Sequence, residues 1–420
     1  MLQGPRMPAP SVTEPAPVDV AQVDVEIDAL DDLGRGVGRA QALDGFTVRV
    51  PFTLPGERVQ ARIWRRDDAG HEAHGDLLAV LAPSPARVAP GCPLFGTCGG
   101  CQFQHAGYPA QLDWKTALVR RHLHAAGLDL DVAACAPSPR TYGYRSKITP
   151  HHDRVHSTRP LTIGFLKVGR RHDVVDVERC PLATDGINAA LPALRAEIAA
   201  AAVGRRRGAS FLIREAASGV TTDPDARVTE QVGAVSLEFF AREFFQNNPF
   251  LLPRMVDFVV ESAAATGATR LVDTYSGSGL FVLAAAARFQ DVVGVEVSAG
   301  AVMAARENAA RNGLAHVRFV QANAAGIFAA LAPEATAAAA ETAVIVDPPR
   351  KGCDEAFVAQ LLAFGPHAIV YVSCSPESLA RDLARLLPAG YAATAVQPFD
   401  MFPQTRHVEC VAVLRRTNSE

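Results

Sequence analysis

The spacing of apolar residues changes along the chain and predicts different structures in different parts. Between Val18 and about Val80, apolar and polar residues alternate in short runs, namely VDVEIDAL, FTVRVPF, RVQARIW and GDLLAVL. Alternation of period two is typical of strands with one buried face, and turn-forming stretches such as DDLGRGVGRA separate the runs. This pattern predicts a small closed or nearly closed OB-like β-barrel over residues 18–83. The Pro-rich residues 1–17 before it are expected to form a disordered tail.

From about Asn247 onward, apolar strand-like runs alternate with Ala-rich helical stretches. The strand-like runs are TRLVDTY, DVVGVEVS, VRFVQAN, TAVIVDPP and AIVYVSC. Such alternation predicts an α/β fold over residues 247–420, a Rossmann-like, doubly wound parallel sheet with helices on both faces. The segment between the two patterns, residues 84–246, is expected to be a mixed α+β domain. It contains a helical stretch, YPAQLDWKTALVRRHLHAAG, and strand-like runs such as LTIGFLKVG and HDVVDVERC.

Composition narrows the class of protein. The 420 residues are 49% hydrophobic, enough for about two or three domains with buried cores. Eight cysteines in this length are too few for a disulfide scaffold. No signal-peptide core and no run of about 18 apolar residues occurs, so we expect a cytoplasmic protein in a reducing compartment, away from membranes. The net charge of −3 excludes a protein that binds nucleic acid through its overall charge. The Arg pairs and triplets fit either compositional bias or local phosphate binding.

A glycine-rich turn follows the first strand of the α/β part. In LVDTYSGSGLF, Gly277 and Gly279 allow the backbone to approach a ligand closely. Glu296 ends the next strand and can accept hydrogen bonds from both hydroxyls of a ribose. These features fit either a dinucleotide or S-adenosylmethionine. Val282 stands where a dinucleotide-binding motif has its third glycine, which favours S-adenosylmethionine and methyl transfer.

Cys374 ends another buried strand, in YVSCSPESLARDL. Ser375 and Pro376 after it are typical of a helix N-cap and first helical residue. A thiol at a helix N-terminus is expected to have its thiolate form favoured by the helix dipole, which makes it a candidate nucleophile. The alternative is a small buried cysteine with no chemical role.

Glu409 lies in an apolar strand near the C-terminus, in MFPQTRHVECVAVL. A carboxylate there is expected to be either paired, for example with Arg406, or functional. A cysteine, a base and a sulfonium donor are the groups needed to methylate carbon 5 of a uracil. The thiolate adds to carbon 6, carbon 5 then takes the methyl group, and the base removes the carbon 5 proton.

Three cysteines, Cys92, Cys98 and Cys101, are grouped in GCPLFGTCGGCQFQH. Their spacing is compatible with a disulfide, a zinc site, an iron–sulfur cluster or a redox pair. The reducing compartment disfavours a disulfide, and the first interval is longer than in ordinary zinc knuckles.

The chain resembles the RNA uracil-5-methyltransferase family, which includes the ribosomal and transfer RNA 5-methyluridine enzymes. The resemblance covers residues 91–410 and rests on GCPLFGTCGGCQFQH, YGYRSKI, IGFLKVGRRHDVVDVERCPL, FFQNNPF, DTYSGSGLF, VDPPRKG, YVSCSPESLARDL and MFPQTRHVEC. The N-terminal barrel is similar to the RNA-binding TRAM domain of many members. The resemblance implies a Rossmann-like class I methyltransferase domain, a cluster-bearing central domain and structured RNA as the partner, with 23S rRNA favoured over tRNA. No obligate protein partner is evident from the sequence.

The resemblance also implies residue roles. Cys374 would be the nucleophile and Glu409 the proton acceptor. The S-adenosylmethionine site would comprise Gln246, Tyr275, Gly277, Gly279, Glu296, Asn323 and Asp347. A [4Fe–4S] cluster would be held by Cys92, Cys98, Cys101 and Cys180, which leaves Cys135, Cys353 and Cys410 outside this scheme. The chain departs from the family pattern at Leu280, Asn323 and Ser276.

Three other functions are compatible with parts of this pattern. A methyltransferase acting on an exocyclic amine would need an aromatic residue where Arg350 follows the DPP turn, and it would have no use for Cys374. RNA cytosine-5 methylation also uses a thiolate, and only the resemblance separates it from the uracil reaction. A non-catalytic RNA-binding or chaperone protein would not need both Cys374 and Glu409.

Overall fold

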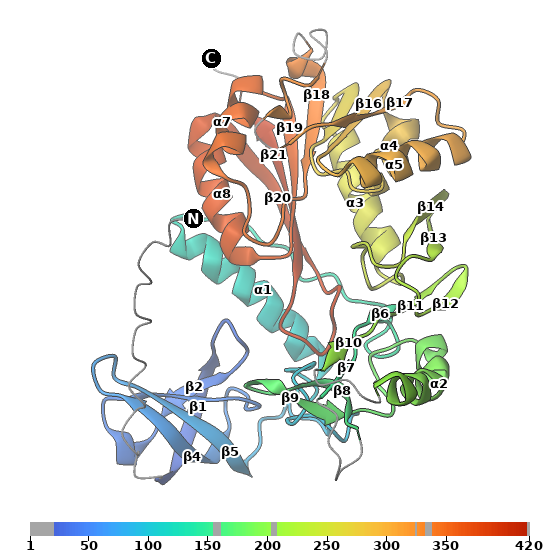
Figure 1. Ribbon diagram of the computed structural model, residues 1–420. Helices are drawn as coiled ribbons and strands as arrows, with labels where there is room; N and C mark the ends of the chain where they lie inside the picture. Colours follow the sequence, from blue (N-terminus) through green and yellow to red (C-terminus); the bar gives the residue numbers. More distant parts are fainter. Residues whose placement is uncertain (1–20, 154–160, 203–207, 324–325, 332–337, 418–420) are drawn as a thin grey trace, which may run out of the picture. The chain divides into compact units, whose positions relative to one another are not determined.

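The computed structural model describes residues 21–153, 161–202, 208–323, 326–331 and 338–417 (Figure 1). These residues form two compact units that divide after Arg87. The predicted N-terminal tail lies outside the described residues. The predicted central and methyltransferase segments both fall in the second unit, so the boundary expected near residue 246 stays a prediction.

The first unit is a closed five-stranded barrel. Its strands are β1 (Gln22–Leu30), β2 (Gly36–Arg39), β3 (Thr47–Val50), β4 (Arg58–Asp67) and β5 (Glu72–Ala82), in the order β1-β2-β3-β5-β4. The structure confirms the predicted alternation of buried and exposed residues. Val23, Val25 and Ile27 of β1 are buried in the barrel core, and the residues between them are exposed.

The sequence prediction missed strand β2, which lies inside the stretch interpreted as a turn. Its glycines are required by close contacts rather than by a reversal of the chain. A Cβ on Gly38 would lie 1.8 Å from the carbonyl oxygen of Glu26 on β1, and one on Gly36 would lie 1.9 Å from Oγ1 of Thr53. Glycine here allows two backbones to approach each other.

The second unit begins with the cysteine-rich loop and helix α1 (Tyr108–Ala125), as the sequence predicts. Several small sheets and helix α2 (Asp185–Ala202) follow. The sheets have the orders β10-β7-β8-β9, β12-β11-β6 and β13-β14. Their strands are β6 (Lys147–Ile148), β7 (His151–His152), β8 (Ile163–Lys167), β9 (Arg170–Asp176), β10 (Ala209–Ser210), β11 (Ile213–Ala216), β12 (Gly219–Thr221), β13 (Arg227–Val232) and β14 (Val235–Phe240).

A seven-stranded sheet dominates the second unit, in the order β17-β16-β15-β18-β19-β21-β20. The five strands predicted from the sequence are β15 (Arg270–Asp273), β16 (Asp291–Glu296), β17 (Val317–Gln321), β18 (Thr342–Val346) and β19 (Ala368–Ser373), and all five pair in parallel. The sheet as a whole is mixed rather than parallel, which corrects the prediction. Strand β21 (Glu409–Arg416) runs antiparallel to both β19 and β20 (Tyr391–Phe399).

Helices cover both faces of this sheet. Figure 1 shows α3 (Leu252–Ala264), α4 (Leu280–Ala285) and α5 (Ala299–Arg311) on one face, and α7 (Glu355–Phe364) and α8 (Pro376–Leu386) on the other. Strands β18 and β19 are buried along their whole length, as expected for central strands covered on both faces. In an open α/β sheet of this kind, ligands bind beyond the carboxyl ends of the parallel strands. No helix within the described part of the chain has both the length and the apolarity to cross a membrane.

Candidate functional site

Strand register brings Cys374 and Glu409 together. The antiparallel pairing of β19 with β21 ends with Ser373 opposite Cys410. One residue further along the same register, Cys374 faces Glu409, the first residue of β21. Asp347 follows the neighbouring parallel strand β18 at the same edge of the sheet. Three ionisable side chains therefore lie together at the carboxyl edge of the sheet.

The end of β19 is fixed by the helix that follows it. Ser375 is the N-cap of α8 and its hydroxyl accepts a hydrogen bond from the Ser378 amide, while Pro376 begins the helix. This confirms the local structure that the sequence predicts. Cys374 itself is partly exposed.

The net shift of the Cys374 pKa runs against the lowered pKa that the helix N-terminus alone predicts. The pKa of the Cys374 thiol is raised to about 11, first because the side chain is largely buried and then because Glu409 and Asp347 are negatively charged neighbours. Arg350 lowers the pKa, but by less. Burial raises a thiol pKa because desolvation penalises the charged thiolate, and neighbouring carboxylates add to this by repulsion.

The two carboxyl groups are also perturbed. Glu409 is 4% exposed, and burial together with the charge of Asp347 raises its pKa to about 8. Burial raises the pKa of Asp347 to about 7. Carboxyl groups with pKa values this close to neutrality are suited to accept a proton and release it again. Burial and Asp347 account for this shift among the described residues, which does not support the alternative that Arg406 neutralises Glu409.

The glycine-rich turn after β15 adopts the conformation that the sequence predicts. Gly277 and Gly279 have φ angles of +52° and +100°, which only glycine adopts readily. No atom of the described residues lies within 4 Å of the position that a Cβ on Gly277 would occupy, so this position of the turn leaves room for a ligand. The Glu296 carboxylate accepts hydrogen bonds from the amides of Gly277 (3.1 Å) and Ser298 (2.8 Å), which hold it beside the turn.

Among the residues that the structure describes, several buried polar atoms of the second unit have no hydrogen-bond partner. Three of them belong to this turn or to the segment leading to α3: Oε1 of Gln246, Oδ2 of Asp273 and Oγ of Ser276. Buried polar atoms are normally paired, so an unpaired group is a candidate ligand contact. Tyr275 packs its ring against Phe357, with centroids 5.4 Å apart. Asn323 follows β17 and is exposed.

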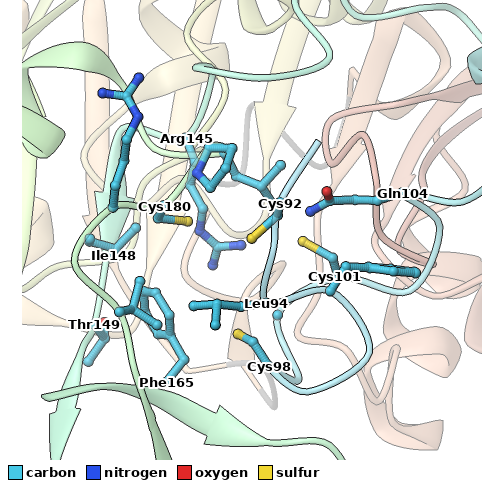
Figure 2. Close-up of a pocket in the computed structure, with 16 residues that line it drawn as sticks. Cys92, Leu94, Cys98, Cys101, Gln104, Arg145, Ile148, Thr149, Phe165 and Cys180 are labelled. Atoms are coloured by element: carbon cyan, nitrogen blue, oxygen red, sulfur yellow. The ribbon is translucent and has the colours of Figure 1, made fainter. Parts of the chain in front are cut away.

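The predicted cluster cysteines also come together. Cys92, Cys98, Cys101 and Cys180 line one cavity of about 180 Å³, and Figure 2 shows their sulfur atoms facing it. Cys180 comes from the segment between β9 and α2, and its amide donates a hydrogen bond to the side chain of Asn188. Among the described residues, no group of three or more His, Cys, Asp or Glu side chains is arranged so that it could hold a metal ion. The iron–sulfur assignment therefore stays a prediction.

Comparison with known proteins decides the family. The model of the tRNA (uracil-5-)-methyltransferase family matches residues 226–417. The chain is 38% identical over 423 residues to the tRNA (uracil(54)-C(5))-methyltransferase of Schizosaccharomyces pombe, covering 95% of this chain and 79% of that protein. The chain belongs to the RNA uracil-C5 methyltransferase family.

Other members of the RNA uracil-C5 methyltransferase family are also similar to this chain. A Klebsiella pneumoniae 23S rRNA (uracil(1939)-C(5))-methyltransferase is 32% identical over 431 residues, covering 94% of this chain and 96% of that protein. The crystal structure of Pyrococcus abyssi tRNA (uracil-54, C5)-methyltransferase with S-adenosyl-L-homocysteine matches with a TM-score of 0.71 and 25% identity, covering 93% of this chain and 99% of that chain. This chain is accordingly an S-adenosylmethionine-dependent RNA methyltransferase, which excludes the non-catalytic alternative.

Two further candidate site residues in this RNA uracil-C5 methyltransferase were not identified from the sequence. Asp273 ends β15, is fully buried, and has its pKa raised to about 8 by burial. In the sequence, an acidic residue directly after the apolar residues Leu271 and Val272 could have indicated this site. Phe244 lies two residues before Gln246 and is 78% exposed, whereas Phe245 stacks on Phe239 inside the core. Nothing in the letters FFQ shows which phenylalanine faces solvent.

Proposed function

We propose that the protein transfers a methyl group from S-adenosylmethionine to carbon 5 of a specific uridine in structured RNA, through a covalent bond between Cys374 and carbon 6 of the base. The observation that supports this most directly is the β19–β21 register, which places the nucleophile candidate beside the base candidate. S-adenosylmethionine, when bound, supplies an electrophilic methyl group.

The residues around the glycine-rich turn fit S-adenosylmethionine. The structure shows unpaired buried atoms on Gln246, Asp273 and Ser276 and free space at Gly277. Further proposed contacts are Tyr275, Gly279, Glu296 and Asp347. Asn323, which is exposed, is a further proposed contact.

The proposed roles of the protein groups combine their position at the edge of the sheet with the direction of their pKa shifts. The Cys374 thiol is protonated at neutral pH, so its proton must leave before attack, and Asp347 is a neighbouring carboxyl group that can accept it. The thiolate sulfur then bonds to carbon 6, and the displaced electron pair makes carbon 5 nucleophilic. After methylation, the Glu409 carboxylate takes the proton from carbon 5. The carbon 6–sulfur bond breaks and its electron pair returns to the sulfur.

The RNA substrate would be recognised through its shape and through contacts to its unstacked bases. Exposed Phe244 beside Gln246 offers a flat apolar face on which a base can stack. The N-terminal barrel, proposed as a TRAM-like RNA-binding domain, would add a second contact surface. The sequence prediction favours 23S rRNA, whereas the higher identity to the Schizosaccharomyces pombe tRNA enzyme favours tRNA. Mass-spectrometric mapping of 5-methyluridine in rRNA and tRNA from cells with and without the protein tests both. Unchanged maps would refute the proposal.

Breakdown of the covalent adduct is expected to become faster as pH rises towards about 8. Glu409 accepts a proton only when ionised, and its raised pKa of about 8 means that the ionised fraction increases through neutrality. The rate of adduct decay after a single turnover, measured from about pH 6 to pH 9, gives the profile. The variant Glu377→Gln, which changes an exposed carboxylate on α8, should keep the same profile. A flat profile in the unaltered protein would show that Glu409 is not the base.

We further propose that the four cysteines around the 180 Å³ cavity hold a [4Fe–4S] cluster. The support is the donor set, since four thiols facing one space suit such a cluster. Cys101→Ser and Cys180→Ser are expected to lower iron and acid-labile sulfide per chain, measured chemically after anaerobic purification. Cys135→Ala, which changes a buried cysteine outside the cavity, is the matched control and should leave both unchanged. Full iron content in the two serine variants would contradict the assignment.

A further inference from the structure

The segment formed by residues 400–408 determines where Glu409 lies. It connects β20 to β21 and ends at Glu409, so any shift of the segment moves the start of β21. Most of its residues are buried. Several of the contacts that hold it come from residues about 300 positions earlier in the chain, in α1 and in the continuation of the cysteine-rich loop, and others come from Tyr144 and Asn248.

Gln404 is the centre of these contacts. It is 4% exposed, and its φ of +67° is a left-handed conformation that a glutamine adopts only when its surroundings enforce it. Its carbonyl oxygen accepts hydrogen bonds from the amides of Gln102 and Phe103, both at 3.0 Å. These are the two residues that directly follow Cys101. The cysteine-rich loop is thus joined by backbone hydrogen bonds to the segment that carries Glu409.

Gln111 of α1 completes the connection. Its Oε1 accepts a hydrogen bond from the Gln404 amide (2.9 Å), and its Nε2 donates to Oε1 of Gln404 (3.0 Å). The same Nε2 lies within hydrogen-bond distance of the carbonyl oxygens of Phe103 (3.2 Å) and Ala106 (2.9 Å). Gln111 is 1% exposed. One side chain therefore binds both the end of the cysteine-rich loop and Gln404.

A second contact holds the beginning of the segment. Lys115, one turn further along α1 from Gln111, forms a fully buried ion pair with Asp400 and donates a hydrogen bond to the carbonyl oxygen of Phe402 (3.1 Å). Breaking a buried ion pair usually destabilises the whole fold, so this pair supports the argument but is not a useful site for a test.

From these contacts we propose that Gln111 and Gln404 are positioning residues for Glu409. We also propose that they couple the position of Glu409 to the four-cysteine site, so that loss of a cysteine or of its bound group displaces Glu409. The inference rests on the function proposed above. Cys374 is positioned by the end of β19 and by the N-cap of α8, neither of which belongs to residues 400–408. Loosening the segment should therefore slow removal of the carbon 5 proton and release of the adduct, while attack by Cys374 continues. The cysteine-rich loop would act as a support for one step of catalysis.

Two variants loosen the segment without removing a reacting group. Gln111→Met keeps the length of the side chain and removes its hydrogen bonds, and Gln404→Gly tolerates the left-handed backbone but lacks the side chain. In both, turnover with methyl-acceptor RNA should fall about 10- to 100-fold, because small displacements of a catalytic group have effects of this size. The fraction of enzyme recovered as covalent RNA adduct on a denaturing gel should rise. A purely structural defect would lower turnover and adduct together.

The matched control is Tyr391→Phe. It also removes one buried hydrogen bond, from the Tyr391 hydroxyl to the Pro366 carbonyl oxygen (2.9 Å), but at the far end of the β20–β21 pair. Turnover and adduct should stay as in the unaltered protein. If Gln111→Met and Gln404→Gly lower turnover without raising the adduct fraction, the inference fails. If the unaltered protein itself forms no adduct and no 5-methyluridine, the proposed function fails instead.

A measurement independent of activity tests the connection to the cysteines. In Cys101→Ser, hydrogen–deuterium exchange should become faster at the amides of Gln102, Phe103 and Gln404, whose bonds join the loop to the segment. The peptide containing β19 should be unchanged. The unaltered protein treated with an iron chelator provides a second sample if the variant folds poorly. Unchanged exchange at residues 102–103 and 404 in both samples would overturn the proposed coupling.

Discussion

Replacing Cys374 with alanine is expected to abolish methyl transfer while leaving RNA binding largely intact. The thiol lies opposite Glu409 at the end of β19. Among the described residues of β19 and β21, the other cysteine at this point is Cys410, and its side chain is completely buried. Removing a covalent nucleophile should lower turnover by more than about 10³-fold, because the remaining groups cannot make carbon 5 nucleophilic. Methyl incorporation from labelled S-adenosylmethionine and RNA affinity by filter binding are the two measurements.

Cys374→Ser separates chemistry from packing. A hydroxyl fills nearly the same space but is a much weaker nucleophile than a thiolate, so this variant should be inactive as well. Cys135→Ala, a buried cysteine outside both proposed sites, should keep its activity. Substantial turnover in Cys374→Ala would rule out the covalent mechanism, and loss of RNA binding together with activity would point to a structural role for this residue.

Glu409→Gln is expected to trap the enzyme on RNA. The carboxyl group of Glu409 is buried and has a pKa of about 8, so it is largely neutral at pH 7, and a neutral amide of the same shape should preserve the fold. The amide cannot accept the carbon 5 proton. Turnover should therefore fall by about 10²- to 10⁴-fold, the range usual for loss of a general base. A protein–RNA band that survives denaturation should accumulate and contain both Cys374 and the methyl group.

The control for this prediction is Glu377→Gln, because Glu377 is an exposed carboxylate close in sequence to Cys374 but outside the buried cluster. It should neither lose turnover nor accumulate adduct. Free protein with persistent turnover in Glu409→Gln would show that another group removes the proton, and Asp347 would then be the first candidate because its pKa is also raised, to about 7.

The two sites of the second unit differ in how they are built. The proposed chemical site uses strand ends of a single sheet, where register and the surrounding helices fix each side chain. The cysteine cavity uses loops, with three thiols on one loop and the fourth after β9. Loops usually need an additional constraint to hold a defined geometry. The hydrogen bonds from Gln102 and Phe103 to Gln404 provide one such constraint, and the same bonds reach the segment that ends at Glu409.

The sequence by itself determined the local features of the protein. The five parallel strands of the large sheet, the positive-φ glycines at Gly277 and Gly279, and the Ser375–Pro376 helix start all depend on residues that are close along the chain. Alternation of apolar residues, glycine conformation and N-capping act over a few positions, so they can be read without a structure. The resemblance to family motifs indicated the candidate site residues, but it did not predict how they are arranged in space.

Only the tertiary structure decided the long-range features. The β19–β21 register pairs residues 374 and 409, and Gln111 reaches Gln404 across 293 positions of sequence. The direction of the Cys374 pKa shift was mispredicted because the helix terminus is local, whereas burial and the charges of Glu409 and Asp347 come from distant segments. Strand β2 was missed for a similar reason, since its glycines are required by Glu26 and Thr53. Contacts between distant segments set these environments, and no local pattern encodes them.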